Sequence, residues 1–302
     1  MTRPVVFVVM DGVGLSENTV GNAVKQAYTP TLDSLMKNIP YTSIQAHGVA
    51  VGLPSDDDMG NSEVGHNAIG CGQIYAQGAK LVNQSLESGE IFTSETWNKA
   101  MAQAQNSTLH FIGLLSDGNV HSHIDHLIAM VKQAKLSGVK KVRSHILLDG
   151  RDVPATSGLI YVEQLENLFK ELNDENFDAR IASGGGRMYV TMDRYDADWT
   201  MVERGWQTHV LGEGRQFTSA KEAIETYRTE GGYNDQNLPA FVIAENGEPL
   251  GKIVDGDAVI FNNFRGDRAI EITKAFEFAD KDFPYFDRKV RPNVFYAGML
   301  QY

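Results

Sequence analysis

Short apolar runs that alternate with helical stretches constrain the fold of this 302-residue chain more than any other feature. The runs are rich in Val, Ile, Leu and Phe, which is typical of buried strands. The predicted strands cover residues 5–10, 41–46, 108–114, 141–148, 179–183, 258–262 and 294–300. The predicted helices cover residues 30–38, 79–86, 94–105, 123–136, 158–172 and 219–227, with another that begins at Ser62. This alternation predicts an α/β fold.

The predicted strand at residues 5–10 is apolar throughout, which indicates burial on both faces, as in a parallel sheet. It ends at Asp11, and ligands of open α/β sheets bind at the carboxyl ends of strands. Asp11 is therefore a candidate ligand of a hard cation, with an ordinary turn acid as the alternative. A dinucleotide-binding fingerprint is excluded here, because Glu17 stands where the third glycine is required.

The composition limits the classes of function. The chain has 39 acidic and 27 basic residues, a formal net charge of −12, which disfavours nucleic acid or an anionic membrane as a partner. The single cysteine, Cys71, excludes an intrachain disulfide and fits a reducing compartment. The early apolar run is too short for a signal peptide or a membrane span, so we expect a cytoplasmic protein. The length suggests about two domains.

Ser62 follows a Gly-, Pro- and Asp-rich loop at residues 47–61 and opens a predicted helix. A hydrolase nucleophile elbow is disfavoured, because Val64 occupies the position of its second glycine. Two interpretations stay open. Ser62 is either a plain helix cap or a residue that carries a phosphate at the helix N-terminus, where amide groups favour anions.

Three histidines lie close together after the predicted strand at residues 108–114: His121, His123 and His126. We expect His121, in the loop, to touch the substrate as a hydrogen-bond donor or proton carrier. A metal-dependent hydrolase built on His121 and His123 is the rival hypothesis. It is disfavoured because no partner acid or histidine cluster follows at a useful spacing.

Twelve of the 13 arginines lie between Arg143 and Arg291, and several follow predicted strands in Gly- or Asp-containing loops. The candidates are Arg151, Arg187, Arg194, Arg265 and Arg268. Because a guanidinium binds carboxylate or phosphate through two parallel hydrogen bonds, we expect these arginines to converge on an anion. The alternative is solvated surface charge.

Together these motifs resemble the N-terminal portion of the cofactor-independent (2,3-bisphosphoglycerate-independent) phosphoglycerate mutases of the alkaline phosphatase superfamily. The matching motifs lie at residues 10–12, 58–67, 113–118, 120–123, 149–152, 263–265 and 267–268. The resemblance covers the whole chain. It implies an alkaline-phosphatase-like domain, present only in its N-terminal part at residues 1–76, and an inserted α/β transferase domain at residues 77–302 with a short return segment near its end.

The resemblance also implies an activity and its residues. Family members interconvert 3-phosphoglycerate and 2-phosphoglycerate in glycolysis and gluconeogenesis through a phosphoserine, without requiring 2,3-bisphosphoglycerate. Ser62 matches the nucleophile, and Asp11 and Ser62 match ligands of one of two divalent ions, with Mn²⁺ favoured. The residues that match substrate-holding positions are His121, Arg151, Asp152, Arg187, Arg194, Arg265 and Arg268.

The chain departs from the family pattern in its length. Family members are much longer, and their second half carries the remaining Asp and His metal ligands and a substrate lysine. The last histidine here is His209, so the later residues cannot supply those histidines. We therefore expect the isolated chain to be a catalytically silent fragment or one half of a split enzyme. We also expect a monomer whose partners are the two phosphoglycerates, without nucleic acid or membrane.

Overall fold

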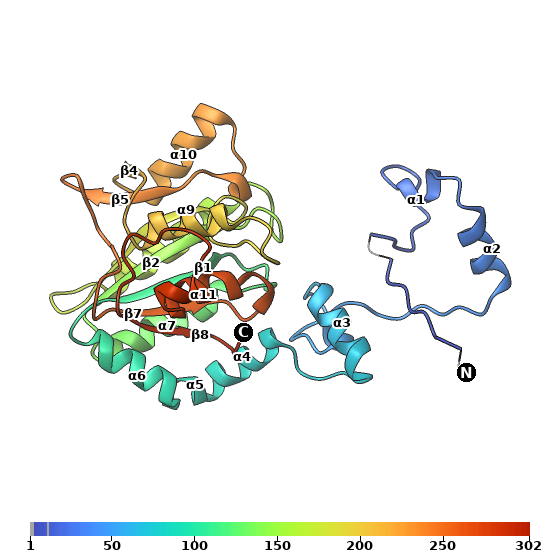
Figure 1. Ribbon diagram of the computed structural model, residues 1–302, viewed down its shortest axis with the longest axis horizontal. Coiled ribbons are helices and arrows are strands. Elements are labelled where there is room, and N and C mark those ends of the chain that lie inside the picture. The colour runs from blue at the N-terminus through green and yellow to red at the C-terminus, as the bar shows by residue number, and fades with distance from the viewer. Residues whose placement is uncertain (1–2, 11) are drawn as a thin grey trace. The chain divides into compact units, whose positions relative to one another are not determined.

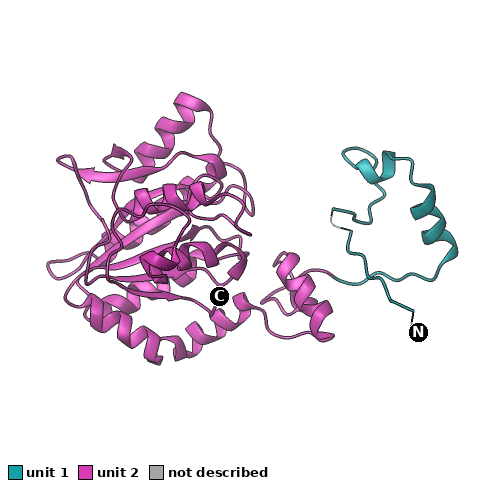
Figure 2. Cartoon of the chain, viewed as in Figure 1, with its two compact units in different colours: residues 1–45 teal, residues 46–302 magenta. Residues whose placement is uncertain are grey.

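The chain divides into two compact units, Met1–Gln45 and Ala46–Tyr302, in a computed structural model that describes residues 3–10 and 12–302 (Figure 2). The first unit holds α1 (Ala23–Gln26) and α2 (Pro30–Asn38). Pro30 occupies the first turn of α2, where a missing amide hydrogen costs nothing, and this helix confirms the sequence prediction.

The predicted strands at residues 5–10 and 41–46 are wrong for this structure. Residues 5–10 form no strand, and Val5 is 95% and Val8 69% exposed. A strand is stable only when its amide and carbonyl groups pair with a neighbouring strand. The described residues of the first unit contain no strand that could supply such pairing. Asp11 lies outside the described residues.

The second unit is built around one eight-stranded sheet (Figure 1). The strands are β1 (Leu109–Leu115), β2 (Lys141–Leu148), β3 (Asp178–Gly186), β4 (Arg215–Phe217), β5 (Phe241–Glu245), β6 (Glu248–Pro249), β7 (Ala258–Asn262) and β8 (Phe295–Gly298). Their spatial order is β4-β5-β3-β2-β1-β7-β8, and β6 pairs with β5. The pairs from β3 through β2, β1 and β7 to β8 are all parallel, whereas β5 is antiparallel to β3.

Helices connect these strands. The α-helices are α3 (Ser62–Cys71), α4 (Gly78–Ser88), α5 (Glu90–Thr93), α6 (Glu95–Ala104), α7 (Ile124–Leu136), α8 (Gly158–Leu172), α9 (Trp199–His209), α10 (Ala220–Gly231) and α11 (Ile270–Glu277). The 3₁₀ turns are η1 (Gly48–Val51), η2 (Asp235–Asn237), η3 (Gly266–Arg268) and η4 (Asp280–Asp282). Among the described residues, no helix is long and apolar enough to cross a bilayer.

Two hydrophobic cores cover the two faces of the sheet. One joins buried side chains of α6, α7, α8 and α10 to the strands, and the other joins those of α9 and α11 to the opposite face. Alternate residues of one strand enter different cores: Phe111 belongs to the first and Ile112 to the second. A mainly parallel sheet between two helical layers confirms the predicted α/β class.

The strand order reverses beside β1. The chain moves from β1 to β2 and β3 in one direction and later returns to place β7 on the other side of β1. Ligands of open α/β sheets bind at the carboxyl ends of strands near such a reversal. The loops after β1, β2, β3 and β7 are therefore where we expect a ligand to bind.

Candidate functional site

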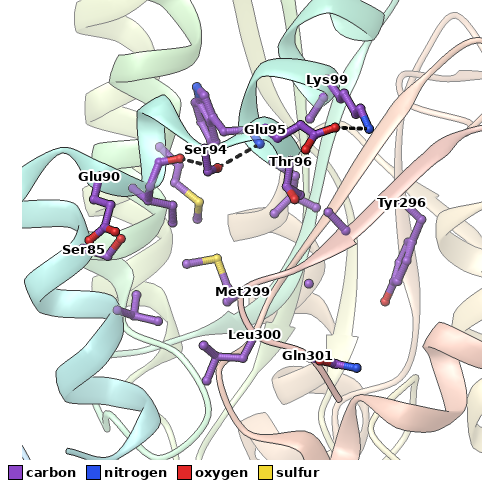
Figure 3. A pocket seen from close by; sticks show the side chains of 18 of the residues that line it. Ser85, Glu90, Ser94, Glu95, Thr96, Lys99, Tyr296, Met299, Leu300 and Gln301 are labelled. Atoms are coloured by element: carbon purple, nitrogen blue, oxygen red, sulfur yellow. Dashed lines mark hydrogen bonds and ion pairs between the residues drawn. The ribbon is translucent and has the colours of Figure 1, made fainter.

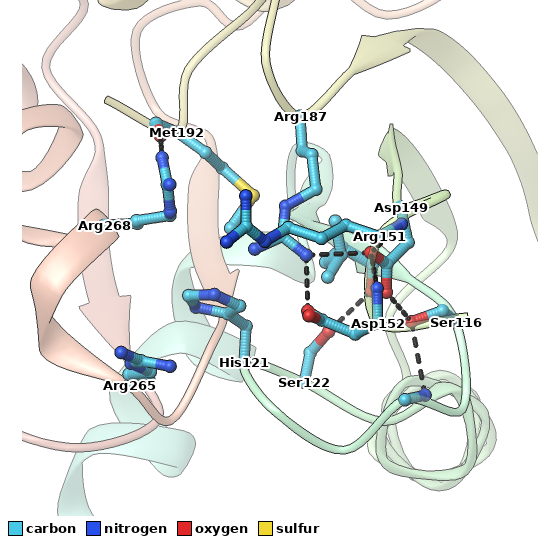
Figure 4. Close-up of polar contacts among 12 residues, drawn as sticks. Ser116, His121, Ser122, Asp149, Arg151, Asp152, Arg187, Met192, Arg265 and Arg268 are labelled. Carbon is cyan, nitrogen blue, oxygen red and sulfur yellow. Dashed lines mark hydrogen bonds and ion pairs between the residues drawn. The ribbon is translucent and has the colours of Figure 1, made fainter. Parts of the chain in front are cut away.

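The loops at the carboxyl ends of four parallel strands carry most of the predicted substrate residues (Figure 4). His121 follows β1, Arg151 and Asp152 follow β2, Arg187 directly follows β3, and Arg265 and Arg268 follow β7. Arg194 comes from the segment before α9. We call these five arginines with His121 and Asp152 the arginine cluster.

Asp149 organises the loop after β2. Its Oδ1 accepts hydrogen bonds from the amides of Arg151 (3.2 Å) and Asp152 (3.0 Å) and from Nη1 of Arg187 (2.7 Å). Its Oδ2 accepts from the Ser116 hydroxyl (2.7 Å), and the residue is only 1% exposed. One buried carboxylate thus joins the loops after β1, β2 and β3.

Gly150 makes the turn of this loop possible. Its φ is +61°, a conformation that other residues adopt at a cost, and an added Cβ would lie 2.9 Å from the amide nitrogen of Gln236. The tight turn leaves the Arg151 side chain exposed and brings Asp152 to Nη1 of Arg187, with which it forms an ion pair.

Asp267 contacts several residues of the cluster, as Asp149 does in the loop after β2. Its Oδ2 lies 3.0 Å from Nη2 of Arg265 and 3.4 Å from Nη1 of Arg194. Its Oδ1 lies 3.9 Å from Nδ1 of His121. Asp149 and Asp267 are not among the predicted site residues, although both stand inside the matching motifs at residues 149–152 and 267–268.

Arg268 is buried and donates from Nη1 to the carbonyl of Met192. Burial, together with the neighbouring charges of Arg187 and Arg194, lowers its pKa to about 10. The guanidinium is therefore still charged at neutral pH.

His121 lies inside the cluster and is 2% exposed. Burial holds its pKa well below the ordinary value, and the charges of Arg187 and Arg265 add to this effect. The ring is consequently neutral at pH 7, with one nitrogen able to donate and the other able to accept a hydrogen bond.

Several buried polar atoms of the cluster and of the neighbouring Asp267 have no hydrogen-bond partner among the described residues. They are His121 Nδ1, Arg187 Nε, Arg265 Nε and Asp267 Oδ1. Buried polar atoms in folded proteins are nearly always paired, so their concentration here marks a place that binds a polar ligand.

Ser62 begins α3, as predicted, but it is not the helix cap. The Asn61 side chain accepts from the amide of Val64 (3.2 Å) and performs that role. The interpretation of Ser62 as a plain cap is therefore wrong, and its exposed hydroxyl lies 3.2 Å from Nδ1 of His66 instead.

His66 was missed by the sequence analysis, although it stands one helical turn after Ser62. Its Nδ1 also lies 2.7 Å from the carbonyl oxygen of Ser62. A carbonyl only accepts, so Nδ1 carries the proton and cannot accept one from the hydroxyl. In this arrangement His66 orients Ser62 and is not its base.

Glu63 links α3 to the arginine cluster. Its Oε2 lies 3.6 Å from Nε of Arg265. Burial raises the pKa of Glu63, and the charge of Arg265 opposes that rise. A second link joins Asn119 to Asp58, with 2.5 Å between Nδ2 and Oδ1. The structure therefore brings the Ser62 segment to the same edge of the sheet as the arginines.

His123 and His126 have structural roles. His123 caps α7 by accepting from the amide of Asp125, and His126 is buried with Nε2 2.5 Å from Oδ1 of Asn83. Over residues 3–10 and 12–302, no three His, Cys, Asp or Glu side chains form a group that could hold a metal ion. The described donors therefore do not by themselves fit a centre for two divalent ions.

An open cavity of about 810 Å³ lies elsewhere, between α4–α6 and β8 (Figure 3). Of its labelled polar side chains, Ser94 caps α6 and Glu95 pairs with Lys99. It offers no set of converging charges like that of the arginine cluster, so the cluster is the better candidate site.

Comparisons with known proteins show the family of the chain. A family model described as "BPG-independent PGAM N-terminus" matches residues 82–302. A probable 2,3-bisphosphoglycerate-independent phosphoglycerate mutase of Leptospira interrogans (serovar copenhageni) is 57% identical, covering 100% of this chain and 56% of that protein. The 2,3-bisphosphoglycerate-independent phosphoglycerate mutase of Trypanosoma brucei brucei is 52% identical, covering 99% and 55%.

A solved structure of Leishmania mexicana phosphoglycerate mutase, obtained at low cobalt concentration, matches with a TM-score of 0.93 and 50% identity. The match covers 97% of this chain and 54% of that one. The chain thus spans about half the length of the relatives it matches. By sequence and by structure, it belongs to the N-terminal family of the 2,3-bisphosphoglycerate-independent phosphoglycerate mutases.

Proposed function

We propose that this chain supplies the substrate-binding arginines and the nucleophile for interconversion of 3-phosphoglycerate and 2-phosphoglycerate. The observation that carries the proposal is a set of five arginines at one edge of the sheet. Four of them, Arg187, Arg194, Arg265 and Arg268, lie near the neutral, buried His121, and Arg151 lies near Arg268.

The charge balance of the site supports an anionic substrate. The five arginines of the cluster stand beside four carboxylates, those of Asp149, Asp152, Asp267 and Glu63, so the formal balance is 5 − 4 = +1. A phosphoglycerate carries a carboxylate and a phosphate, both of which accept paired hydrogen bonds from guanidinium groups. The neutral His121 adds a donor and an acceptor for a hydroxyl or phosphate oxygen.

The position of Ser62 supports a role as the phosphoryl acceptor. It lies in the first turn of α3, where free amides and the helix dipole stabilise an anion. In the proposed reaction the Ser62 Oγ–phosphorus bond forms as the bond from phosphorus to the 3-oxygen breaks, and the serine proton passes to that oxygen. The 2-hydroxyl then attacks the phosphoserine and returns its proton to Ser62, so the whole reaction is an isomerisation without a co-reactant.

The family resemblance implies two divalent ions, with Mn²⁺ favoured. We propose that this chain supplies two ligands of one of them, Asp11 and Ser62. Asp11 lies outside the described residues, and Ser62 is a single oxygen donor. No step is assigned to a metal here, because the described residues do not complete its ligand set.

A second proposal concerns the chain by itself. The exposed apolar residues 5–10 and the incomplete ligand set favour a chain that binds phosphoglycerate but does not turn it over, as a fragment or one half of a split enzyme. The domain boundary at residues 76 and 77, a monomeric state, the cytoplasmic location and a role in glycolysis and gluconeogenesis belong to the same proposal.

Trapping of ³²P tests the function directly. Substrate labelled in the phosphoryl group is turned over by the chain supplemented with a polypeptide that covers the rest of the relatives' length. We expect label on the protein, its loss in Ser62→Ala, and product formation in a coupled enolase assay with Mn²⁺. Equal labelling of Ser62→Ala would reject the nucleophile, and turnover by the unsupplemented chain would reject the silent-fragment proposal.

A further inference from the structure

A chain of hydrogen bonds crosses the interior of the second unit, beneath the arginine cluster. It runs from Asp257 Oδ2 to His110 Nε2 (3.1 Å), from His110 Nδ1 to His145 Nε2 (2.9 Å), and from His145 Nδ1 to Ser183 Oγ (2.7 Å). It continues from Ser183 Oγ to His209 Nδ1 (2.7 Å) and from His209 Nε2 to Thr191 Oγ1 (3.1 Å). All six residues are at most 1% exposed, and the proposed reaction uses none of them.

The charge of Asp257 determines which atom donates in each of these five hydrogen bonds. Asp257 also accepts from the Ser107 hydroxyl and from the amides of Thr108 and Val254. Hydrogen bonds from His110 and Ser107 hold its pKa below the usual value against the effect of burial, so the carboxyl is ionised. Its partner atom, His110 Nε2, must therefore donate.

The remaining assignments follow in sequence. Burial lowers the pKa of all three histidines, so each ring has one donor and one acceptor nitrogen. His110 Nδ1 accepts from His145 Nε2, and His145 Nδ1 accepts from the Ser183 hydroxyl. Ser183 in turn accepts from His209 Nδ1, and His209 Nε2 accepts from the Thr191 hydroxyl. All five bonds point toward Asp257.

Thr191, at the opposite end of the hydrogen-bond chain from Asp257, has an unfavourable backbone conformation that its hydrogen bonds must hold in place. Its φ is +69°, which is a true outlier for a β-branched residue and strains the backbone there. Its amide donates to the Met201 carbonyl (2.9 Å). Its hydroxyl lies so close to α9 that a Cβ at Gly205 would stand 2.2 Å from Oγ1.

The next residue connects Thr191 to the arginine cluster. The carbonyl of Met192 accepts from Nη1 of Arg268, and Met192 is fully buried. That carbonyl belongs to the peptide plane after Met192. The φ and ψ angles of Thr191 set where the Met192 backbone lies, and the buried Met192 carries its carbonyl from that position to Arg268.

We propose that the histidine chain from Asp257 to Thr191 is a positioning device for Arg268: it holds Thr191 in its left-handed conformation and so aims the Met192 carbonyl at the guanidinium. His110, His145 and His209 are positioning residues, because they act on the site only through Thr191 and Met192. The effect on substrate affinity rests on the proposed function, whereas the proton assignment and the hold on Arg268 do not.

Nitrogen-15 NMR of the histidine side chains in the full chain tests the proton assignment. At neutral pH we expect three neutral rings, with the proton on Nε2 in His110 and His145 and on Nδ1 in His209. A protonated ring among the three, or the opposite tautomer at His209, would overturn the inference.

Thr191→Val tests the positioning role, since it keeps the β-branched shape and removes only the hydroxyl. Thr208→Val is the matched control, because the buried Thr208 hydroxyl bonds only to Arg204 within α9 (2.7 Å). We expect Thr191→Val to speed solvent exchange of the Arg268 guanidinium protons, and to weaken 3-phosphoglycerate binding, by about tenfold relative to the control. Ser183→Ala breaks the same chain nearer its centre and serves if Thr191→Val does not fold.

The two readouts separate the possible failures. If the wild-type chain does not bind 3-phosphoglycerate, the proposed function falls, and Arg268 exchange still decides the positioning role. If Arg268 exchange in Thr191→Val and Ser183→Ala equals that in Thr208→Val, the positioning role is wrong.

Discussion

At the scale of single residues, the site depends on carboxylates that hold arginines in place as much as on the arginines themselves. Asp149 receives four hydrogen bonds while 1% exposed, and Arg187 is equally buried. The sequence analysis identified the arginines because strand ends and Gly-Arg pairs are visible in a sequence. Asp149 and Asp267 were not identified as their partners, because the contacts of Asp149 with Arg187 and of Asp267 with Arg194 join residues 38 and 73 positions apart along the chain.

Asp149→Asn should both destabilise the chain and weaken the site. The amide keeps the shape but loses the charge opposite buried Arg187, and breaking a buried ion pair costs about 3 kcal/mol. We expect that loss in urea unfolding and a lower affinity for 3-phosphoglycerate in calorimetry. Asp174→Asn is the control, because its pair with Lys135 is on the surface and its removal should leave the unfolding midpoint unchanged.

Gly150→Ala should affect the site through one backbone turn. A side chain at φ +61° costs about 1 kcal/mol, and the contact with Gln236 adds to it. Gly247→Ala is matched in conformation, with φ +82°, but a Cβ there meets nothing within 4 Å. Binding titrations of both variants should show reduced phosphoglycerate affinity only for Gly150→Ala; a similar loss in Gly247→Ala would argue against a specific role for the turn.

At the scale of elements, prediction from sequence succeeded where the pattern alone determines the outcome. The strand at residues 141–148, the helix at 158–172 and the strand at 258–262 have the predicted bounds. The prediction failed at residues 5–10, whose apolar pattern specifies a strand but not the neighbours that it needs. It also missed α9, because Gly205, Thr208 and His209 are poor helix formers whose packing and hydrogen bonds exist only in the fold.

The histidine chain ties four elements together and should make stability depend on pH. Burial lowers the pKa of His209 to about 3, below its pKa in the unfolded chain. When the pH falls below the pKa of the unfolded chain, the unfolded state therefore binds a proton at His209 that the folded state does not bind. The contribution of His209 to the free energy of unfolding is therefore present above about pH 6.5 and is lost as the pH falls. Between about pH 7.5 and about pH 5, this histidine lowers the free energy of unfolding by about 2 kcal/mol.

Urea unfolding of His209→Gln at both pH values checks this sign. The variant is less stable at neutral pH but should lose about 2 kcal/mol less on acidification than the unsubstituted chain. Thr208→Val keeps every titrating group and should retain the full pH dependence. An unchanged pH dependence in His209→Gln would mean that His209 does not titrate as its burial requires.

At the scale of the whole molecule, the net charge of −12 conceals a local contrast. Nearly all arginines follow residue 142, and the fold gathers five of them where four parallel strands end. In the proposed function, this arrangement holds a small anion at short range in an otherwise acidic protein. The chain covers about half the length of its relatives, so binding is the part of the proposed activity that it can show alone.

Calorimetric titration of the 302-residue chain with 3-phosphoglycerate is the most direct test of the central claim. Arg151 is the exposed arginine of the cluster, and Arg215 is an exposed arginine that pairs with Glu230 outside it. We predict that the chain binds, that Arg151→Ala weakens binding about tenfold or more, and that Arg215→Ala binds like the unsubstituted chain. Absence of binding, or equal loss in the two variants, would contradict the assignment of the arginine cluster as a phosphoglycerate site.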